Sequence, residues 1–217
     1  MMAGHPHQNQ AIVTTGKPLT EAQAALILLH GRGATAESIL TLAQELDQPE
    51  FAYLAPQATG YTWYPYSFLA PIPQNEPGIT SGIAVVSALV EQIAAAGIPY
   101  RQIMIGGFSQ GACLALEFVA RHARRYGGVL GYSGGLIGPD GTPRDYPGSL
   151  GETPIFLGCS DVDAHIPKAR VKLTAGVLEE LGGQVSMRLY PAMGHTINQD
   201  EIEAGREMMA SLLEETG

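Results

Sequence analysis

Ser109 lies in residues 107–111, whose G-x-S-x-G spacing can present a serine hydroxyl as a nucleophile. An apolar run precedes it from residue 101, and an apolar-periodic run follows it to residue 120. Glycines on both sides allow the close backbone approach that a tight strand-to-helix turn needs. The amide groups that begin the following helix would face whatever the serine attacks. This stretch therefore predicts a nucleophile elbow.

A second G-x-S-x-G match, residues 131–135, surrounds Ser133. An apolar run at 128–132 precedes this serine, but glycine- and proline-rich sequence follows at 136–143. Such residues favour a loop, so Ser133 lacks the helix start that an elbow requires. We interpret Ser133 as the end of a strand that packs closely against a neighbour, and Ser109 as the nucleophile.

His195 is the best-placed base for Ser109. A serine hydroxyl is a poor nucleophile near neutral pH and needs a histidine within hydrogen-bond reach. His195 follows the last predicted strand, which gives the chain order Ser, Asp, His. His5 and His7 lie in a loose N-terminal segment, where they would be solvated, and His122 lies on the helix after Ser109. His30 and His165 lie at the ends of other strands.

The histidine in turn needs a carboxylate, which fixes its tautomer and stabilises the imidazolium. Asp161 and Asp163 share one loop after a predicted strand at 154–158, and their spacing alone leaves the choice open. Asp140 and Asp145, in the preceding loop, are typical turn residues.

Two backbone amides, those of Gln110 and Arg32, are expected to bind the oxyanion of a tetrahedral intermediate. Glycines on both sides of Arg32 let its amide point inward, and His30 would hold that turn in place. Residues 31–36 also fit the dinucleotide-binding pattern G-x-G-x-x-A. The end of the next strand, 53–56, offers no acid for a ribose hydroxyl, which weakens this alternative.

Strands and helices alternate along the chain, and the run at 24–29 is typical of a strand buried on both faces. We expect strands at 11–15, 24–29, 51–55, before Ser109, at 128–132, 154–158 and 185–190, and helices at 34–46, 78–96, after Ser109, at 168–181 and 199–213. This alternation predicts an α/β fold: a mostly parallel sheet with helices on both faces, in one domain over residues 1–217 with a loose segment at 1–20. Ligand sites in such sheets lie at the carboxyl ends of the strands, where the residues proposed for chemistry fall.

The composition is that of a soluble globular protein, with 217 residues, 45% of them hydrophobic and 15% charged. A net charge of −9 argues against nucleic acid and anionic membranes as partners. Polar residues interrupt the apolar stretch 79–96, and the polar start has no signal-peptide pattern, so we expect a cytoplasmic protein without stable membrane insertion. Cys113 and Cys159 are expected to be buried core residues. No metal or organic cofactor is expected, and the oligomeric state stays open, a homodimer included.

Five sequence motifs together resemble the phospholipase/carboxylesterase family, the small, lidless α/β-hydrolases related to acyl-protein thioesterases. They are LHGRGA at 29–34, WYP at 63–65, GGFSQG at 106–111, DAHIP at 163–167 and MGH at 193–195. The resemblance runs from about residue 24 to the C-terminus. It implies the α/β-hydrolase fold, Ser109 as nucleophile, Asp163 as acid, His195 as base, and the Arg32 and Gln110 amides as the oxyanion hole.

The stretch 133–153 is too short for a lid domain, so the loop at 61–72 should wall the substrate pocket. Trp63 is the foremost expected substrate contact there, with Tyr64 and Tyr66 beside it, because large aromatic side chains exclude water and shape a pocket. His165 either contacts the substrate or fills its own loop.

Two departures from the thioesterase-like members favour simple ester hydrolysis over protein depalmitoylation. Ala34 stands where those members often carry Asp, and residues 164–167 read Ala-His-Ile-Pro where they favour Pro-Val-Val-Pro. The sequence thus predicts a serine carboxylesterase that hydrolyses small to medium esters through an acyl-enzyme on Ser109. The alternatives are a lysophospholipase or acyl-thioesterase acting on longer acyl chains, and a non-catalytic ligand-binding module of the same fold.

Overall fold

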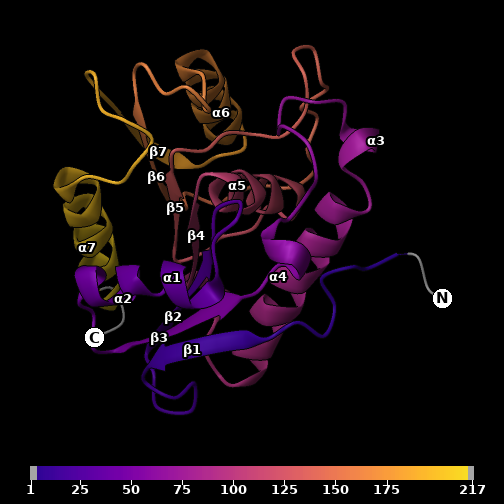
Figure 1. Cartoon of the computed structure of the whole chain (residues 1–217). Helices are drawn as coiled ribbons and strands as arrows, with labels where there is room; N and C mark the ends of the chain where they lie inside the picture. The colour runs from indigo at the N-terminus through magenta and orange to yellow at the C-terminus, as the bar shows by residue number, and fades with distance from the viewer. Residues whose placement is uncertain (1–3, 215–217) are drawn as a thin grey trace.

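Seven strands form one twisted sheet in the order β1-β3-β2-β4-β5-β6-β7 in the computed structural model, which describes residues 4–214 (Figure 1). β1 pairs with β3 in the antiparallel sense, and every other neighbouring pair is parallel. The strands are Ile12–Gly16, Ala24–Leu29, Phe51–Pro56, Ile103–Phe108, Gly128–Tyr132, Pro154–Ser160 and Gln184–Tyr190, β1 to β7 in chain order. The predicted mostly parallel sheet is confirmed.

Helices cover both faces of this sheet (Figure 1). The helices are Ala36–Ile39, Thr41–Leu46, Ile72–Asn75, Gly78–Ala95, Gln110–Arg121, Lys168–Glu180 and Gln199–Glu214, α1 to α7 in chain order. One apolar cluster joins the sheet to α4, α5 and α6, and a second joins the opposite face to α1, α2 and α7. The central strands are buried on both faces for this reason, and β2 is buried along its whole length.

The helix α4 is long and apolar enough to cross a membrane by length and composition alone, and it is the one such helix in residues 4–214. Half of it is buried within the fold. Its buried residues belong to the core cluster beside α5, so packing inside the fold accounts for its apolar character.

The segment predicted as one helix at 34–46 is instead two short helices, α1 and α2, which meet at Leu40. The Thr35 side chain caps α1 by accepting a hydrogen bond from the Ser38 amide, so the helix starts two residues later than predicted. At the break, the Thr41 hydroxyl donates to the Ser38 carbonyl, which the helical backbone would otherwise use. The loop at 61–72 also ends in the short helix α3, which the sequence did not indicate.

The expectation that His7 is solvated is wrong. Its side chain is buried, its Nε2 lies 2.8 Å from the Trp63 carbonyl oxygen, and its Nδ1 accepts a hydrogen bond from the Thr59 amide. His7 therefore ties the described part of the N-terminal segment to the loop before α3, whereas His5 is exposed as predicted. The first three residues of the predicted loose segment lie outside the described residues.

Candidate active site

Ser109 stands between the end of β4 and the first residue of α5, in the left-handed region with φ 57° and ψ −119°. Two glycines make this turn feasible. A β-carbon on Gly111 would lie 2.1 Å from the Leu29 carbonyl oxygen, and one on Gly107 would lie 2.6 Å from the same atom. The strand, the turn and the helix thus pack so closely that only glycine fits at these positions.

His195, in the loop after β7, lies within hydrogen-bond distance of both Ser109 and Asp163. Its Nε2 is 2.8 Å from the Ser109 Oγ, and its Nδ1 is 2.7 Å from the Asp163 Oδ2. A carboxylate only accepts hydrogen bonds, so Nδ1 carries the proton and Nε2 is left to accept the hydroxyl proton of Ser109. These three side chains, distant in sequence, therefore form one continuous chain of hydrogen bonds.

The carboxylate of Asp163 is buried and fully bonded. Its Oδ1 accepts the backbone amides of His165, at 2.7 Å, and of Ile166, at 3.0 Å. Burial raises the pKa of Asp163, but the hydrogen bond from His195 and the two amides outweigh it, so the net pKa is lowered. Asp163 thus stays ionised next to the imidazole near neutral pH.

Asp161, the other carboxylate of this loop, bonds to the loop that carries His195 and not to its ring. Its Oδ1 accepts the backbone amide of Ala192 at 2.9 Å, and its own amide donates to the Tyr190 carbonyl. Asp161 therefore joins the loop after β6 to the loop after β7, which carries His195. Within the described residues it is Asp163, and not Asp161, that forms a hydrogen bond with the imidazole.

Arg32 and Gln110 belong to two different turns, and both residues line the same cavity as Ser109. Gln110 is the first residue of α5, so its amide has no helical acceptor. Within residues 4–214 the Arg32 amide has no hydrogen-bond acceptor either, whereas its neighbour Gly33 donates to the Tyr61 carbonyl. Both amides are thus available to an incoming oxyanion.

The side chains of Arg32 and Gln110 form hydrogen bonds to residues 63–66 of the loop beside the site. The sequence motifs did not indicate this role. Gln110 accepts the Trp63 amide at 2.9 Å and donates to the Tyr64 carbonyl at 2.8 Å. Arg32 donates to the carbonyls of Pro65 and Tyr66 at 2.9 and 2.7 Å. The loop from Trp63 to Tyr66 is therefore held both by the turn after β2, through Arg32, and by the start of α5, through Gln110.

A cavity of about 650 Å³ opens above Ser109, a size typical of small-molecule sites. The predicted contacts Tyr64, Tyr66 and His165 line it together with Phe68 and the Ser109 turn. The His165 ring also packs on that of His195, with centroids 4.7 Å apart.

The prediction that Trp63 contacts the substrate is contradicted. Its side chain is fully buried and is absent from the cavity wall. The indole Nε1 donates to the His30 carbonyl at 2.9 Å, and the ring packs between those of His7 and His30. An indole N–H needs a partner when it is buried, and the turn before Arg32 supplies that partner.

His30 and Ser133 occupy the structural positions predicted for them. His30 is buried, with Nδ1 2.8 Å from the Gly31 carbonyl and Nε2 accepting the Ala58 amide. Burial lowers the pKa of His30, which favours the neutral ring that these bonds require. Ser133 ends β5 without a following helix, and a β-carbon on the adjacent Gly134 would lie 2.5 Å from that of Ala112. Cys113 and Cys159 are buried free thiols, as predicted.

Glu201, at the start of α7, is a buried acid that sequence reasoning missed. Its Oε2 accepts the Asn198 amide while Asn198 Oδ1 accepts the Glu201 amide, a reciprocal cap that fixes the end of the His195 loop. The sequence signal was available: an Asn followed three residues later by Glu before a helix. Its Oε1 has no hydrogen-bond partner within the described residues.

Burial raises the pKa of Glu201 to about 7, with a smaller contribution from the charge of Asp200 and an opposing one from the Asn198 amide. The folded state therefore binds a proton more tightly than the unfolded state does. The protein loses stability as pH rises from the ordinary value of 4.5 towards 7, and this loss is complete above that range.

Known proteins share this fold and match this sequence. The family model described as Phospholipase/Carboxylesterase matches residues 8–213. A phospholipase/carboxylesterase structure from Dyadobacter fermentans is 43% identical, with a TM-score of 0.90 over 98% of this chain and 99% of that one. The acyl-protein thioesterase 1 of Debaryomyces hansenii is 29% identical over 88% of this chain and 90% of its own length.

The acyl-protein thioesterase 1 of Neurospora crassa is also 29% identical, over 64% of this chain and 58% of its own length. The family model spans nearly the whole chain, so it confirms both the α/β-hydrolase fold and the relationship expected from the five motifs. The chain therefore belongs to the phospholipase/carboxylesterase family of ester hydrolases.

Proposed function

We propose that this protein is a serine carboxylesterase that hydrolyses small to medium esters through an acyl-enzyme on Ser109, with His195 as the base and Asp163 as the acid. The observation that supports this best is the chain of two short bonds, 2.8 Å from Ser109 to His195 and 2.7 Å from His195 to Asp163. Free amides beside the hydroxyl supply the charge stabilisation that acyl transfer needs.

In the first step the Ser109 Oγ attacks the ester carbonyl while His195 Nε2 takes its proton. The Arg32 and Gln110 amides bind the oxygen that becomes negative. The imidazolium then gives the proton to the leaving alcohol, and the acyl group remains on Ser109. Water attacks this acyl-enzyme with His195 again as base, which releases the carboxylic acid and restores the serine. Tyr64, Tyr66 and His165 would contact the substrate.

A matched pair of serine variants tests this proposal. Ser109→Ala should abolish turnover of a short nitrophenyl ester and labelling by a fluorophosphonate, with little change in melting temperature. Ser133→Ala, in the second G-x-S-x-G match, should retain both activities. Full turnover in Ser109→Ala would refute the mechanism, and failure of the wild-type enzyme to react with the fluorophosphonate would favour the non-catalytic binding module.

A second candidate activity is hydrolysis of thioesters or lysophospholipids with longer acyl chains. It is supported by the thioesterase names of the relatives and by apolar residues such as Phe68 and Ile166 in the cavity wall. A series of nitrophenyl esters and acyl thioesters of increasing chain length separates the two. A kcat/KM maximum at short oxygen esters supports the carboxylesterase.

We also propose a cytoplasmic location, which the two free thiols support because disulfides are rare in reducing compartments. Whether the protein forms a homodimer is a question for sedimentation analysis of the purified protein.

A further inference from the structure

Arg32 is an exposed residue that lines the cavity above Ser109, and its guanidinium has no carboxylate partner in the described chain. Its hydrogen-bond acceptors are the Thr62 hydroxyl and the carbonyls of Pro65 and Tyr66, all of them neutral. Across residues 4–214, no carboxylate oxygen comes within ion-pair distance of it. A full positive charge therefore remains at the cavity wall.

The guanidinium is also held in place by hydrogen bonds, and two of its N–H donors are not used in them. Both N–H groups of Nη1 are used, on Thr62 and Pro65, and one of Nη2 is used on Tyr66. The Nε–H and the second Nη2–H are left, because a guanidinium has five donors in a fixed fork. Such a fork suits the paired oxygens of a carboxylate or phosphate.

No aspartate or glutamate is among the residues that line the cavity in the described chain. Asp163 lies behind His195 and is already bonded to it and to two amides. The second acid near the cavity is Glu117, which lies on α5 one turn after Cys113, a residue of the cavity wall.

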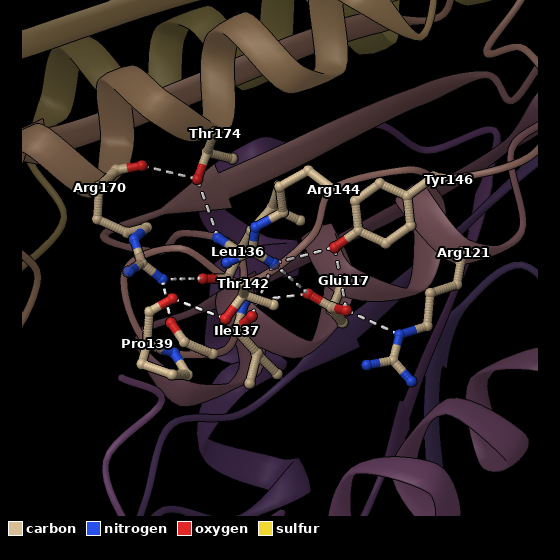
Figure 2. Close-up of polar contacts among 11 residues, drawn as sticks. Glu117, Arg121, Leu136, Ile137, Pro139, Thr142, Arg144, Tyr146, Arg170 and Thr174 are labelled. Carbon is tan, nitrogen blue, oxygen red and sulfur yellow. Dashed lines mark hydrogen bonds and ion pairs between the residues drawn. The ribbon is translucent and has the colours of Figure 1, made fainter. Parts of the chain in front are cut away.

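Figure 2 shows how the charge of Glu117 is compensated. Its Oε1 is 2.7 Å from the Arg121 Nε and accepts the Tyr146 hydroxyl, while its Oε2 accepts the Ile137 amide. Arg144 lies 3.7 Å from the same carboxylate. This buried acid is therefore paired with two arginines.

A third acid, Asp140, is neutralised in the same way. It pairs at 2.8 Å with Arg170, which also donates to the Leu136 carbonyl and whose guanidinium carbon lies 5.9 Å from the centroid of the Phe68 ring at the cavity. Glu117 and Asp140 are thus each paired with an arginine, and Asp163 is bonded to His195 and two amides, whereas Arg32 has no acidic partner within the described residues.

Arg32 thus places a positive charge at the cavity within a chain of net charge −9. The α5 N-terminus at Ser109 adds to this potential, because its partial positive charge faces the cavity. A local potential opposite to that of the whole protein is typical of a site that attracts an oppositely charged substrate.

We propose that the cavity selects esters that carry an anionic oxygen group, a carboxylate or a phosphate, and that the free donors of Arg32 bind this group. The proposal rests on the esterase function proposed above and adds the substrate class. Hydrogen bonds between charged groups, at a partly exposed site, favour an anionic over a neutral ester by roughly tenfold in kcat/KM at low salt.

The test compares substrates of equal acyl length. The mono-nitrophenyl ester of glutaric acid carries a carboxylate where nitrophenyl valerate has a methyl group, and butyryl glycerol phosphate is paired with butyryl glycerol. Rates with Ser109→Ala are subtracted as background. We expect the anionic member of at least one pair to be preferred about tenfold, and this preference to shrink in about 0.5 M salt. The pair that shows it identifies carboxylate or phosphate as the recognised group.

Two substitutions separate the charge of Arg32 from its hold on the loop. Arg32→Lys and Arg32→Gln both lose bonds to the loop, but only Arg32→Gln loses the charge, so only it should reduce the anionic-to-neutral ratio to about one. The ratio is taken within each variant, so a general loss of rate cancels. Arg101→Gln, an exposed arginine at the opposite end of β4, should keep the wild-type ratio.

A wild-type ratio near one in both pairs would overturn the inference and leave the esterase function intact. An anionic preference that survives Arg32→Gln would likewise overturn the role of Arg32. If wild type hydrolysed none of the four esters, the proposed esterase function itself would fail.

Discussion

Replacing Asp163 by Asn should reduce kcat about 10⁴-fold, or about 5 kcal/mol of transition-state stabilisation. The Oδ1 of the new amide would stay on the amides of His165 and Ile166, which Asp163 binds at 2.7 and 3.0 Å. Its NH₂ group would then face the His195 Nδ1. A donor at that position stabilises the tautomer with hydrogen on Nε2, which cannot accept the proton of Ser109.

Asp161→Asn is the matched control, since it also replaces a carboxylate by an amide in the same loop. Its carbonyl oxygen can still accept the Ala192 amide, so at most about 1 kcal/mol, or less than about tenfold in kcat, should be lost.

The assay is kcat for a short nitrophenyl ester at saturation, with melting temperatures recorded to confirm that both variants are folded. If Asp161→Asn lost more turnover than Asp163→Asn, or if Asp163→Asn kept a tenth of wild-type kcat, the assignment of the acid would be wrong.

Two further predictions concern stability. Glu201→Gln keeps an acceptor for the Asn198 amide but removes the titration of the carboxyl group. Relative to wild type, its free energy of unfolding should therefore rise by up to about 3 kcal/mol between pH 4.5 and 8. Urea unfolding of both proteins at both pH values measures this, and a difference that does not change with pH would contradict the raised Glu201 pKa of about 7. Gly111→Ala places a β-carbon 2.1 Å from the Leu29 carbonyl oxygen and should reduce the free energy of unfolding by about 3 kcal/mol. Gly176→Ala, in α6 with no neighbouring atom within 4 Å, should be neutral or stabilising by up to about 1 kcal/mol, and the same urea unfolding compares the two variants.

Local sequence patterns predicted the elements that position the site. The continuous apolar run of β2 and the strand, glycine turn and helix around Ser109 are visible without tertiary information, because burial on both faces and close backbone approach each select residue types. The same patterns distinguished Ser109 from Ser133, since the residues after Ser133 cannot start a helix.

Local sequence patterns did not predict the contacts between segments that are distant in sequence. Trp63 was assigned to the pocket because it stands in an aromatic loop, but its indole N–H bonds to a carbonyl 33 residues away and its ring is enclosed by two histidines. The choice between Asp161 and Asp163 depends on which way a loop turns relative to β7, and the two positions differ by only two residues in sequence. The break between α1 and α2 at Leu40 likewise coincides with a side-chain contact, the bond from the Thr41 hydroxyl to the Ser38 carbonyl.

The residues expected to bind the oxyanion also determine the shape of the pocket, because each has a backbone group on one side and a long side chain on the other. The amides of Arg32 and Gln110 are expected to bind the oxyanion, while their side chains bond to the loop from Thr62 to Tyr66. A substrate that displaces this loop would therefore disturb the amides that stabilise its own transition state. Selection among esters and the rate of their hydrolysis are thus expected to depend on the same few hydrogen bonds rather than on separate parts of the site.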